Sequence, residues 1–163
     1  SELDAAVLWH VLEHLDEPAA ALSRVRSWLR PGGLLLVGVP NAASLQAEIA
    51  GDGWLHWDAP RHRVHFTADG LTRLLARSGF DLVRTHHLVV EQNLHGMWMA
   101  LLTRLGMRPG FAFHFLKRNI DPRPRDLALT AVGIPLIPVA VALEAGAAGI
   151  RRGGTIAAIA RVG

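Results

Sequence analysis

Short apolar runs and amphipathic stretches alternate over the first 90 residues of the chain. Residues 5–9 and 34–39 are continuous apolar runs, as is typical of strands buried on both faces of a parallel sheet. Between them, Pro18 opens a stretch in which aliphatic residues recur at helical spacing. The Pro-Gly-Gly sequence at 31–33 ends that stretch. This order predicts a βαβ unit of an α/β fold.

Further elements follow the same reasoning. Residues 42–50 predict a short helix, and Thr67 is placed to cap a helix that runs through Arg77. Residues 80–90 predict a third strand and residues 155–162 a fourth.

The segment between the third and fourth predicted strands is long and apolar. We expect it to contain its own helices, among them 97–105. From 127 to 143 a single threonine is the only polar residue, but Pro135 and Pro138 interrupt the run. We therefore expect a buried helix pair or a helix lying at a membrane surface, rather than a simple spanning helix.

The domain division follows from these patterns. It places a partial α/β core at 1–92, a helical apolar insertion at 93–152, and the final strand of the core sheet at 153–163.

Composition narrows the class of protein. Half of the 163 residues are hydrophobic and the net charge is +3. The absence of cysteine excludes disulfides, thiolate zinc sites and a cysteine nucleophile, and it agrees with a cytoplasmic location. No basic run with interleaved aromatic residues is present, so we expect no nucleic-acid partner.

Two histidines frame the end of the first predicted strand. His10 and His14 are four residues apart, with Glu13 between them. A metal-dependent hydrolase is one interpretation of such a pattern. However, the order HVLEH differs from the HExxH pattern of zinc proteases, and the sequence indicates no third ligand nearby. We therefore assign no metal.

The loop at 51–66 concentrates aromatic and imidazole side chains. Aromatic walls suit an apolar or aromatic acceptor, and an imidazole can remove a hydroxyl proton. The simpler interpretation, in which these side chains only pack the loop onto the sheet, is equally well supported for the group. The residues in question are Trp54, His56, Trp57, Asp58, Arg61, His62, His65 and Phe66.

Three stretches together resemble the second half of class I S-adenosylmethionine-dependent methyltransferases of the small-molecule type. They read DAAVLWHVLEHLDEP, WLRPGGLLLVGVPN and HFTADGLTRLLARSGF, and the resemblance covers residues 3–90 and, more loosely, 153–162. It implies the C-terminal half of a Rossmann-like sheet, with strand order 4-5-7-6 and the last strand antiparallel. The family's Gly-rich cofactor loop has no counterpart here. We therefore expect that part of the fold is missing upstream, that residues 5–9 form an exposed apolar edge, and that this fragment alone is inactive.

The resemblance also implies roles for individual residues. The turn after the first strand would line S-adenosylmethionine, mainly through its backbone; its residues are Leu8, Trp9, His10 and Val11. The loop would fold over the active site, with His62 and His65 as candidate general bases and His14 on the acceptor side. The candidate acceptor-binding residues are Asn41, Trp54, Trp57 and Arg61. Asn41 could equally be a turn residue that caps the next helix.

The function that we predict is methyl transfer to oxygen or carbon of a small, lipophilic acceptor. An alternative of a different class is a membrane-associated interaction domain, in which residues 97–150 contact lipid and the α/β part is a scaffold. Either interpretation allows a cytoplasmic protein that is peripheral to the inner face of a membrane. A homo-oligomer formed through the insertion helices is equally compatible with the sequence.

Overall fold

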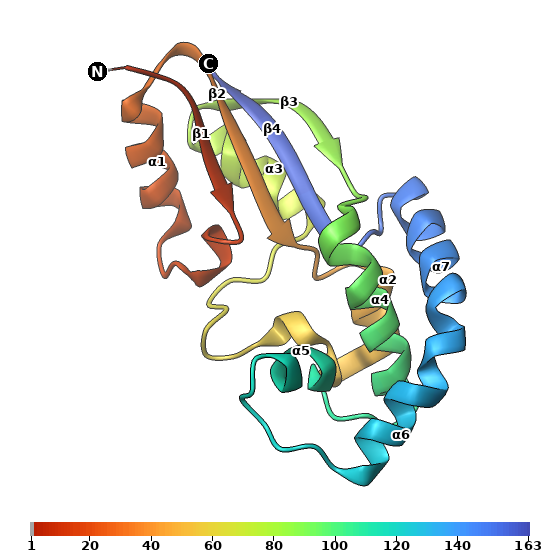
Figure 1. Cartoon of the computed structure of the whole chain (residues 1–163). Helices are drawn as coiled ribbons and strands as arrows, with labels where there is room; N and C mark the ends of the chain where they lie inside the picture. Colours follow the sequence, from red (N-terminus) through yellow and green to blue (C-terminus); the bar gives the residue numbers. More distant parts are fainter. Residues whose placement is uncertain (1) are drawn as a thin grey trace.

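Four strands form one mixed sheet in a computed structural model, which describes residues 2–163 (Figure 1). The sheet order is β1-β2-β4-β3; β1 and β2 are parallel, and β4 is antiparallel to both of its neighbours. The strands are β1 (Leu3–Trp9), β2 (Leu29–Pro40), β3 (Phe80–His86) and β4 (Thr155–Val162). This arrangement confirms the predicted order 4-5-7-6 with an antiparallel last strand.

Helices cover the sheet and extend beyond it. The helices are α1 (Pro18–Trp28), α2 (Leu45–Ala50), α3 (Ala68–Arg77), α4 (Val90–Arg104), α5 (Phe111–Leu116), α6 (Pro124–Gly133) and α7 (Ile137–Gly149). Leu22 of α1 and Leu71 of α3 pack with the strands into one buried apolar cluster. The Thr67 side chain accepts the Gly70 N–H at 3.1 Å, which confirms the predicted cap.

The strand β1 is one of the two edge strands of this sheet. Val7 on β1 is 59% exposed, whereas Leu35 and Val37 of β2 are buried. The expected apolar edge is therefore present, but the expectation that this strand is buried on both faces was wrong. The structure contains no element that covers the outer side of β1 within residues 2–163.

Two predicted boundaries in the second half of the chain were wrong. The third strand ends at His86 instead of residue 90, and α4 begins at Val90, seven residues before the predicted helix start. The apolar residues 88–90 fit a strand or a buried helix start equally well, because a short apolar run carries no periodicity.

The prolines of the insertion do not end its helical course. A 3₁₀ turn at Ile134–Leu136 joins α6 to α7. Pro135 and Pro138 lie in the first turn of the 3₁₀ helix and of α7, where a missing N–H removes no essential hydrogen bond. Figure 1 shows the insertion helices beyond the end of the sheet at which the β1 and β2 arrows point. Ligands of open α/β sheets bind at that end.

Candidate functional site

A pocket of about 430 Å³ lies where β1 ends. One wall is the turn after β1, a second is the loop around residues 55–62, and a third comes from α4 and α5. The lining residues are Trp9, His10, Glu13, His14, Leu55, His56, Asp58, Arg61, His62, Gln92, His95, Gly96, Met99, Phe113 and Lys117. The pocket therefore joins the predicted core to the predicted insertion.

The turn after β1 places a buried carboxylate beside an imidazole. His10 adopts φ of 52°, and its N–H donates to the Gly38 carbonyl at 2.9 Å. The His10 Nδ1 lies 3.0 Å from Glu13 Oε1, and Glu13 is only 1% exposed. The Glu13 Oε2 and His10 Nε2 atoms are buried and have no hydrogen-bond partner among residues 2–163. Buried polar atoms without partners are costly, so these two are candidates to bind a polar group of a ligand.

Glu13 is ionised at neutral pH despite its burial. Burial by itself raises the pKa of the Glu13 carboxyl, but the hydrogen bond and charge of His10 outweigh it, and the net pKa is lowered. The Glu13 backbone carbonyl also accepts the N–H groups of Arg63 and Val64 at 2.7 and 3.1 Å. The same residue thus orients His10 and holds the loop against the turn.

Hydrogen bonds fix the tautomers of two pocket histidines. The Nδ1 of His14 lies 3.0 Å from the Arg61 carbonyl, and the Nδ1 of His62 lies 2.7 Å from the His56 carbonyl. A carbonyl can only accept, so each Nδ1 carries the proton. When neutral, both imidazoles therefore present Nε2 as a hydrogen-bond acceptor, and the two rings lie 4.7 Å apart. An acceptor nitrogen held in this way can take a proton or bind a cation.

His56 lies between other imidazoles and stays neutral. Its ring lies nearly parallel to those of His10 and His62, with ring centroids 6.3 Å and 6.2 Å away. Burial lowers the pKa of His56 to about 4, and charge on the neighbouring imidazoles adds to this effect. The group therefore contributes an uncharged, partly apolar wall to the pocket.

This lowered pKa of His56 predicts a loss of stability in acid. Since an unfolded histidine binds a proton near pH 6.5 and folded His56 only near pH 4, stability falls as pH decreases through that interval. As the pH falls from 7.5 to 4.5, we expect this difference in pKa to lower the free energy of unfolding by about 2.5 kcal/mol. Denaturant unfolding of the His56→Asn variant should show a correspondingly flatter pH dependence. The exposed His86 provides the control, and equal pH slopes for the parent, His56→Asn and His86→Asn would refute the assignment.

Three side chains of the pocket could hold a divalent cation. The donor atoms of Glu13, His14 and His62 all lie within 4.8 Å of one another. Two imidazoles and a carboxylate are a common ligand set for zinc and for iron. The sequence suggested His14 and Glu13 but no third ligand; the loop supplies it as His62. Only the folded loop shows this, since 48 positions separate His14 from His62.

Several other predicted site residues lie outside this pocket. Leu8 packs against the core and Val11 is exposed. Asn41 is buried and uses its side chain within the fold: its Nδ2 donates to the Gly153 carbonyl at 3.0 Å and its Oδ1 accepts the Ala43 N–H at 3.1 Å. These contacts are those expected from the alternative interpretation, in which Asn41 is a turn residue.

The two loop tryptophans mainly pack the loop. Trp54 is buried and lies edge-on to Trp57 at 5.1 Å. The Trp57 Nε1–H donates to the Gly51 carbonyl at 2.9 Å. His65 contacts the Trp57 ring edge-on at 4.8 Å, and its Nε2 lies 3.1 Å from the Trp57 carbonyl. Both Trp54 and His65 border a narrow cleft beside the main pocket. Of the predicted site residues, the pocket therefore brings together Trp9, His10, His14, Arg61 and His62.

Sequence reasoning missed the wall that the insertion provides. His95 and Met99 of α4, and Phe113 and Lys117 in and after α5, line the pocket. The Lys117 Nζ lies 4.2 Å from the centre of the Phe113 ring. The cluster of phenylalanines beside Lys117 and Arg118 was visible in the sequence, but no local signal places it opposite His10.

Comparison with known proteins agrees with this architecture. A family model described as a methyltransferase domain matches residues 1–85, more than half of the chain. The chain therefore belongs to this family of S-adenosylmethionine-dependent methyltransferases. No curated protein matches the sequence.

Solved structures with the same fold are roughly twice as long as this chain. The cyclase SpnF has a TM-score of 0.51 and 20% identity, and the alignment covers 98% of this chain and 49% of SpnF. A SAM-dependent methyltransferase from Archaeoglobus fulgidus has the same TM-score and identity, with 98% of this chain and 59% of that protein covered. The chain thus spans about half the length of the structures it matches. At this identity the likeness concerns the fold.

Proposed function

We propose that the protein transfers a methyl group from S-adenosylmethionine to an oxygen or carbon atom of a small, lipophilic acceptor. The observation that supports this most strongly is the pocket itself. It lies at the carboxyl end of β1, in a chain that belongs to a methyltransferase family. It combines the oriented imidazoles of His14 and His62 with the buried carboxylate of Glu13.

The residues of this turn are suited to contact the cofactor. Trp9 and His10 border the pocket, and the buried His10 Nε2 and Glu13 Oε2 have no partner among the described residues. They offer hydrogen-bonding groups to the polar part of a ligand, and the edge of Trp9 offers an apolar contact. When bound, S-adenosylmethionine supplies an electrophilic methyl group on its sulfonium. The chain provides one wall of this site through Trp9, His10 and Glu13.

The other two walls support a lipophilic acceptor. Met99 and Phe113 are apolar, and His56 adds a ring that is neutral above about pH 4. Lys117 and Arg61 lie at the pocket and could orient a polar end of the acceptor. Quinone-like and polyketide-like compounds match this combination of an apolar body with a nucleophilic hydroxyl group or carbon.

The chemistry requires positioning and the removal of one proton. As the acceptor oxygen or carbon forms its bond to the methyl carbon, the carbon–sulfur bond breaks and sulfur keeps the electron pair. The proton of the acceptor passes to a free imidazole Nε2, for which His62 and His14 are placed. His65 uses its Nε2 on the Trp57 carbonyl, so we assign it no proton-transfer role.

Calorimetry of the full-length protein tests the cofactor part of the proposal. We expect S-adenosylmethionine and S-adenosylhomocysteine to bind, and His10→Ala to weaken both by about tenfold or more, equivalent to one buried hydrogen bond. His86→Ala, an exposed change on β3, should leave both affinities unchanged. Thermal unfolding of each variant shows whether the fold is intact. A folded parent protein that binds neither ligand would refute the proposal.

A metal-dependent hydrolase is the competing interpretation of the same histidines. It is favoured only by the convergence of Glu13, His14 and His62, and the family relationship gives it no support. Metal analysis of the purified protein, followed by methyl-transfer assays before and after chelation, separates the two. A hydrolase requires a bound ion and hydrolytic turnover without S-adenosylmethionine.

A further inference from the structure

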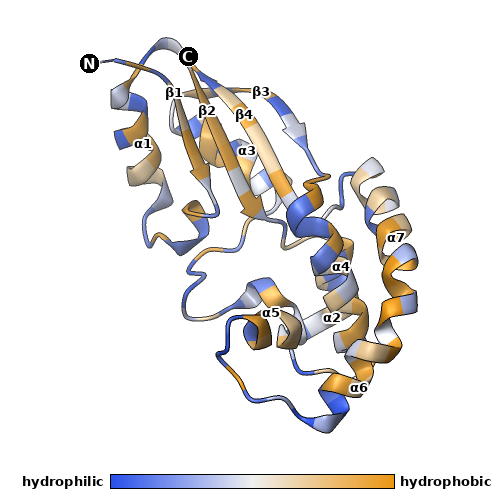
Figure 2. Ribbon diagram, in the orientation of Figure 1, coloured by the Kyte–Doolittle hydropathy of each residue, from blue (hydrophilic) through white to orange (hydrophobic). Residues whose placement is uncertain are grey.

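The helical course α6–α7 is apolar on the side that faces away from the protein. Pro124–Gly149 forms a 26-residue helical stretch, long and apolar enough to cross a membrane. Its most apolar 18-residue window has a mean hydropathy of 2.0, yet only 17% of that window is buried. Figure 2 shows the hydrophobic colour continuing along both helices. The strongly exposed aliphatic side chains are Leu127, Val132, Ile134, Ile137, Val139, Val141 and Ile150.

This surface lacks the polar residues of an ordinary surface helix. Within the described stretch 127–150, the one charged residue is Glu144, which is 0% exposed. Val132, by contrast, is 70% exposed. A helix that packs on a core and faces water on its other side carries polar residues there, whereas a helix apolar all round is normally covered. The outer face of α6–α7 therefore requires an apolar or interfacial environment.

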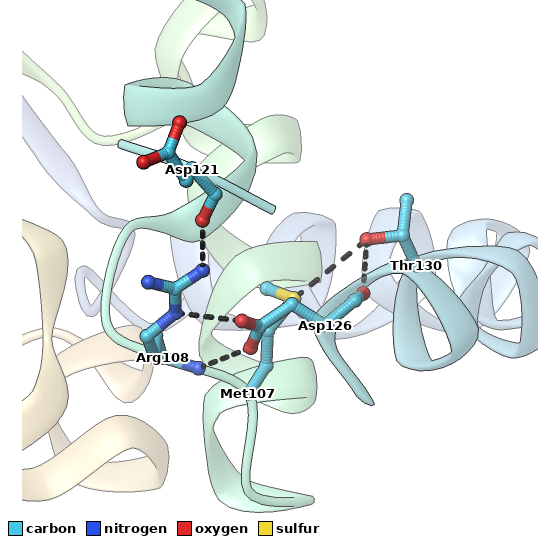
Figure 3. Close-up of polar contacts among 5 residues, drawn as sticks. All are labelled: Met107, Arg108, Asp121, Asp126 and Thr130. Carbon is cyan, nitrogen blue, oxygen red and sulfur yellow. Dashed lines mark hydrogen bonds and ion pairs between the residues drawn. The ribbon is translucent and has the colours of Figure 1, made fainter. Parts of the chain in front are cut away.

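Contacts on the inner side hold the helices against the protein. At the start of α6, Asp126 is 2% exposed and accepts from Arg108 twice, from the backbone N–H at 3.1 Å and from Nε at 2.6 Å (Figure 3). Arg108 also donates to the Asp121 carbonyl at 2.7 Å, and the Thr130 hydroxyl donates to the Asp126 carbonyl at 2.8 Å. In the middle, the Trp98 Nε1–H donates to the Gly133 carbonyl at 2.8 Å.

These contacts favour a helix that lies along a surface over one that crosses a bilayer. Crossing would detach Asp126 from Arg108 and carry Glu144 into hydrocarbon, and intramembrane carboxylates are expensive. With its inner face retained, the outer face alone can enter the boundary between headgroups and acyl chains, to a depth of about 5–10 Å.

The charge distribution identifies the kind of surface. Residues 93–152 carry eight Arg and Lys against three Asp and Glu, a net charge of +5, whereas the rest of the chain carries nine against eleven, a net charge of −2. Exposed arginines flank the apolar face at both ends: Arg118, Arg123 and Arg125 before it, and Arg151 after it. Exposed cations near an anionic bilayer are attracted to its headgroups. In a dimer formed through this face, by contrast, two positively charged segments would face each other.

We propose that the outer face of α6–α7 rests on an anionic phospholipid surface, with the flanking arginines at the headgroups. The protein would then be peripheral to a membrane. The proposal does not depend on methyl transfer, because the face and the pocket are made by different residues.

Vesicle binding by the full-length protein tests the proposal. We expect co-sedimentation with vesicles of phosphatidylcholine and phosphatidylserine, at least tenfold weaker binding to phosphatidylcholine alone, and weakening in 0.5 M salt. The double variant Val132→Asp/Ile137→Asp should lose at least tenfold in affinity, because two exposed aliphatic anchors become anionic. Val83→Asp/Leu88→Asp, which changes two exposed aliphatic residues outside α6–α7, is the matched control and should bind normally.

Three results would overturn the proposal. They are no binding of the parent protein to anionic vesicles, equal loss in both double variants, and equal affinity for neutral and anionic vesicles. Analytical ultracentrifugation identifies the alternative occupant. A parent dimer that Val132→Asp/Ile137→Asp dissociates, without vesicle binding, would assign the face to a second copy of this chain.

Discussion

Replacing Glu144 with leucine should lower the free energy of unfolding by about 2–6 kcal/mol, about 1–3 kcal/mol for each of the two buried donors that lose their acceptor. Glu144 is fully buried and accepts two hydrogen bonds. The Gly154 N–H donates to Oε1 at 2.8 Å, and the Gln46 Nε2–H donates to Oε2 at 2.8 Å. Gln46 donates its second proton to the Asn93 carbonyl at 2.7 Å. Leucine would leave the Gly154 and Gln46 donors without acceptors in a site that excludes water.

The network explains why the effect should be large. Gln46 belongs to α2, Asn93 to α4 and Glu144 to α7, and Gly154 directly precedes β4. Burial raises the pKa of Glu144, and the hydrogen bonds from Gly154 and Gln46 act in the opposite direction without reversing the shift. One carboxyl group thus joins the insertion helices to the sheet.

Denaturant unfolding of matched variants measures this contribution. Glu144→Gln keeps one acceptor oxygen and should cost less, about 1–2 kcal/mol. Val141→Leu, at an exposed position of the same helix, should change the free energy of unfolding by less than about 0.5 kcal/mol. If Glu144→Leu unfolds at the same denaturant concentration as the parent, the network does not stabilise the fold as we argue.

Elements with local signals were predictable from the sequence. Apolar runs identified all four strands, and Thr67 marked the start of α3 because its hydroxyl can satisfy a backbone N–H within three residues. Gly79 follows the end of that helix, and its φ of 78° shows why glycine is suited there. The sheet order came from the family resemblance, since strand pairing between distant segments has no local pattern.

The candidate site was only partly predictable, for a geometric reason. His62 and His65 are three residues apart in an irregular loop, and both were predicted as candidate general bases. In the structure the His56 carbonyl fixes His62 at the pocket, whereas the Trp57 carbonyl engages His65 beside it. Hydrogen bonds to backbone carbonyls of a neighbouring turn decide this difference, and no periodic pattern describes such a turn.

The difference between these two histidines leads to the second large effect. If the proposed methyl transfer is correct, His62→Gln should lower kcat by about 10²–10⁴-fold, the usual contribution of a general base. The Nδ1–H of His62 is held by the His56 carbonyl at 2.7 Å, which leaves Nε2 to accept the acceptor's proton. Glutamine keeps polarity and approximate size but cannot act as a base at neutral pH.

Steady-state kinetics of matched variants separates a chemical role from a structural one. His65→Gln should change kcat by less than about threefold, because the His65 Nε2 is engaged by the Trp57 carbonyl outside the pocket. The KM for S-adenosylmethionine should stay unchanged in His62→Gln, since a base acts on the acceptor and leaves cofactor binding intact. Added imidazole should restore part of the kcat of His62→Ala, since it can occupy the vacated space. A raised KM with an unchanged kcat, or a larger loss in His65→Gln than in His62→Gln, would show that His62 binds or packs and that the proton leaves by another group.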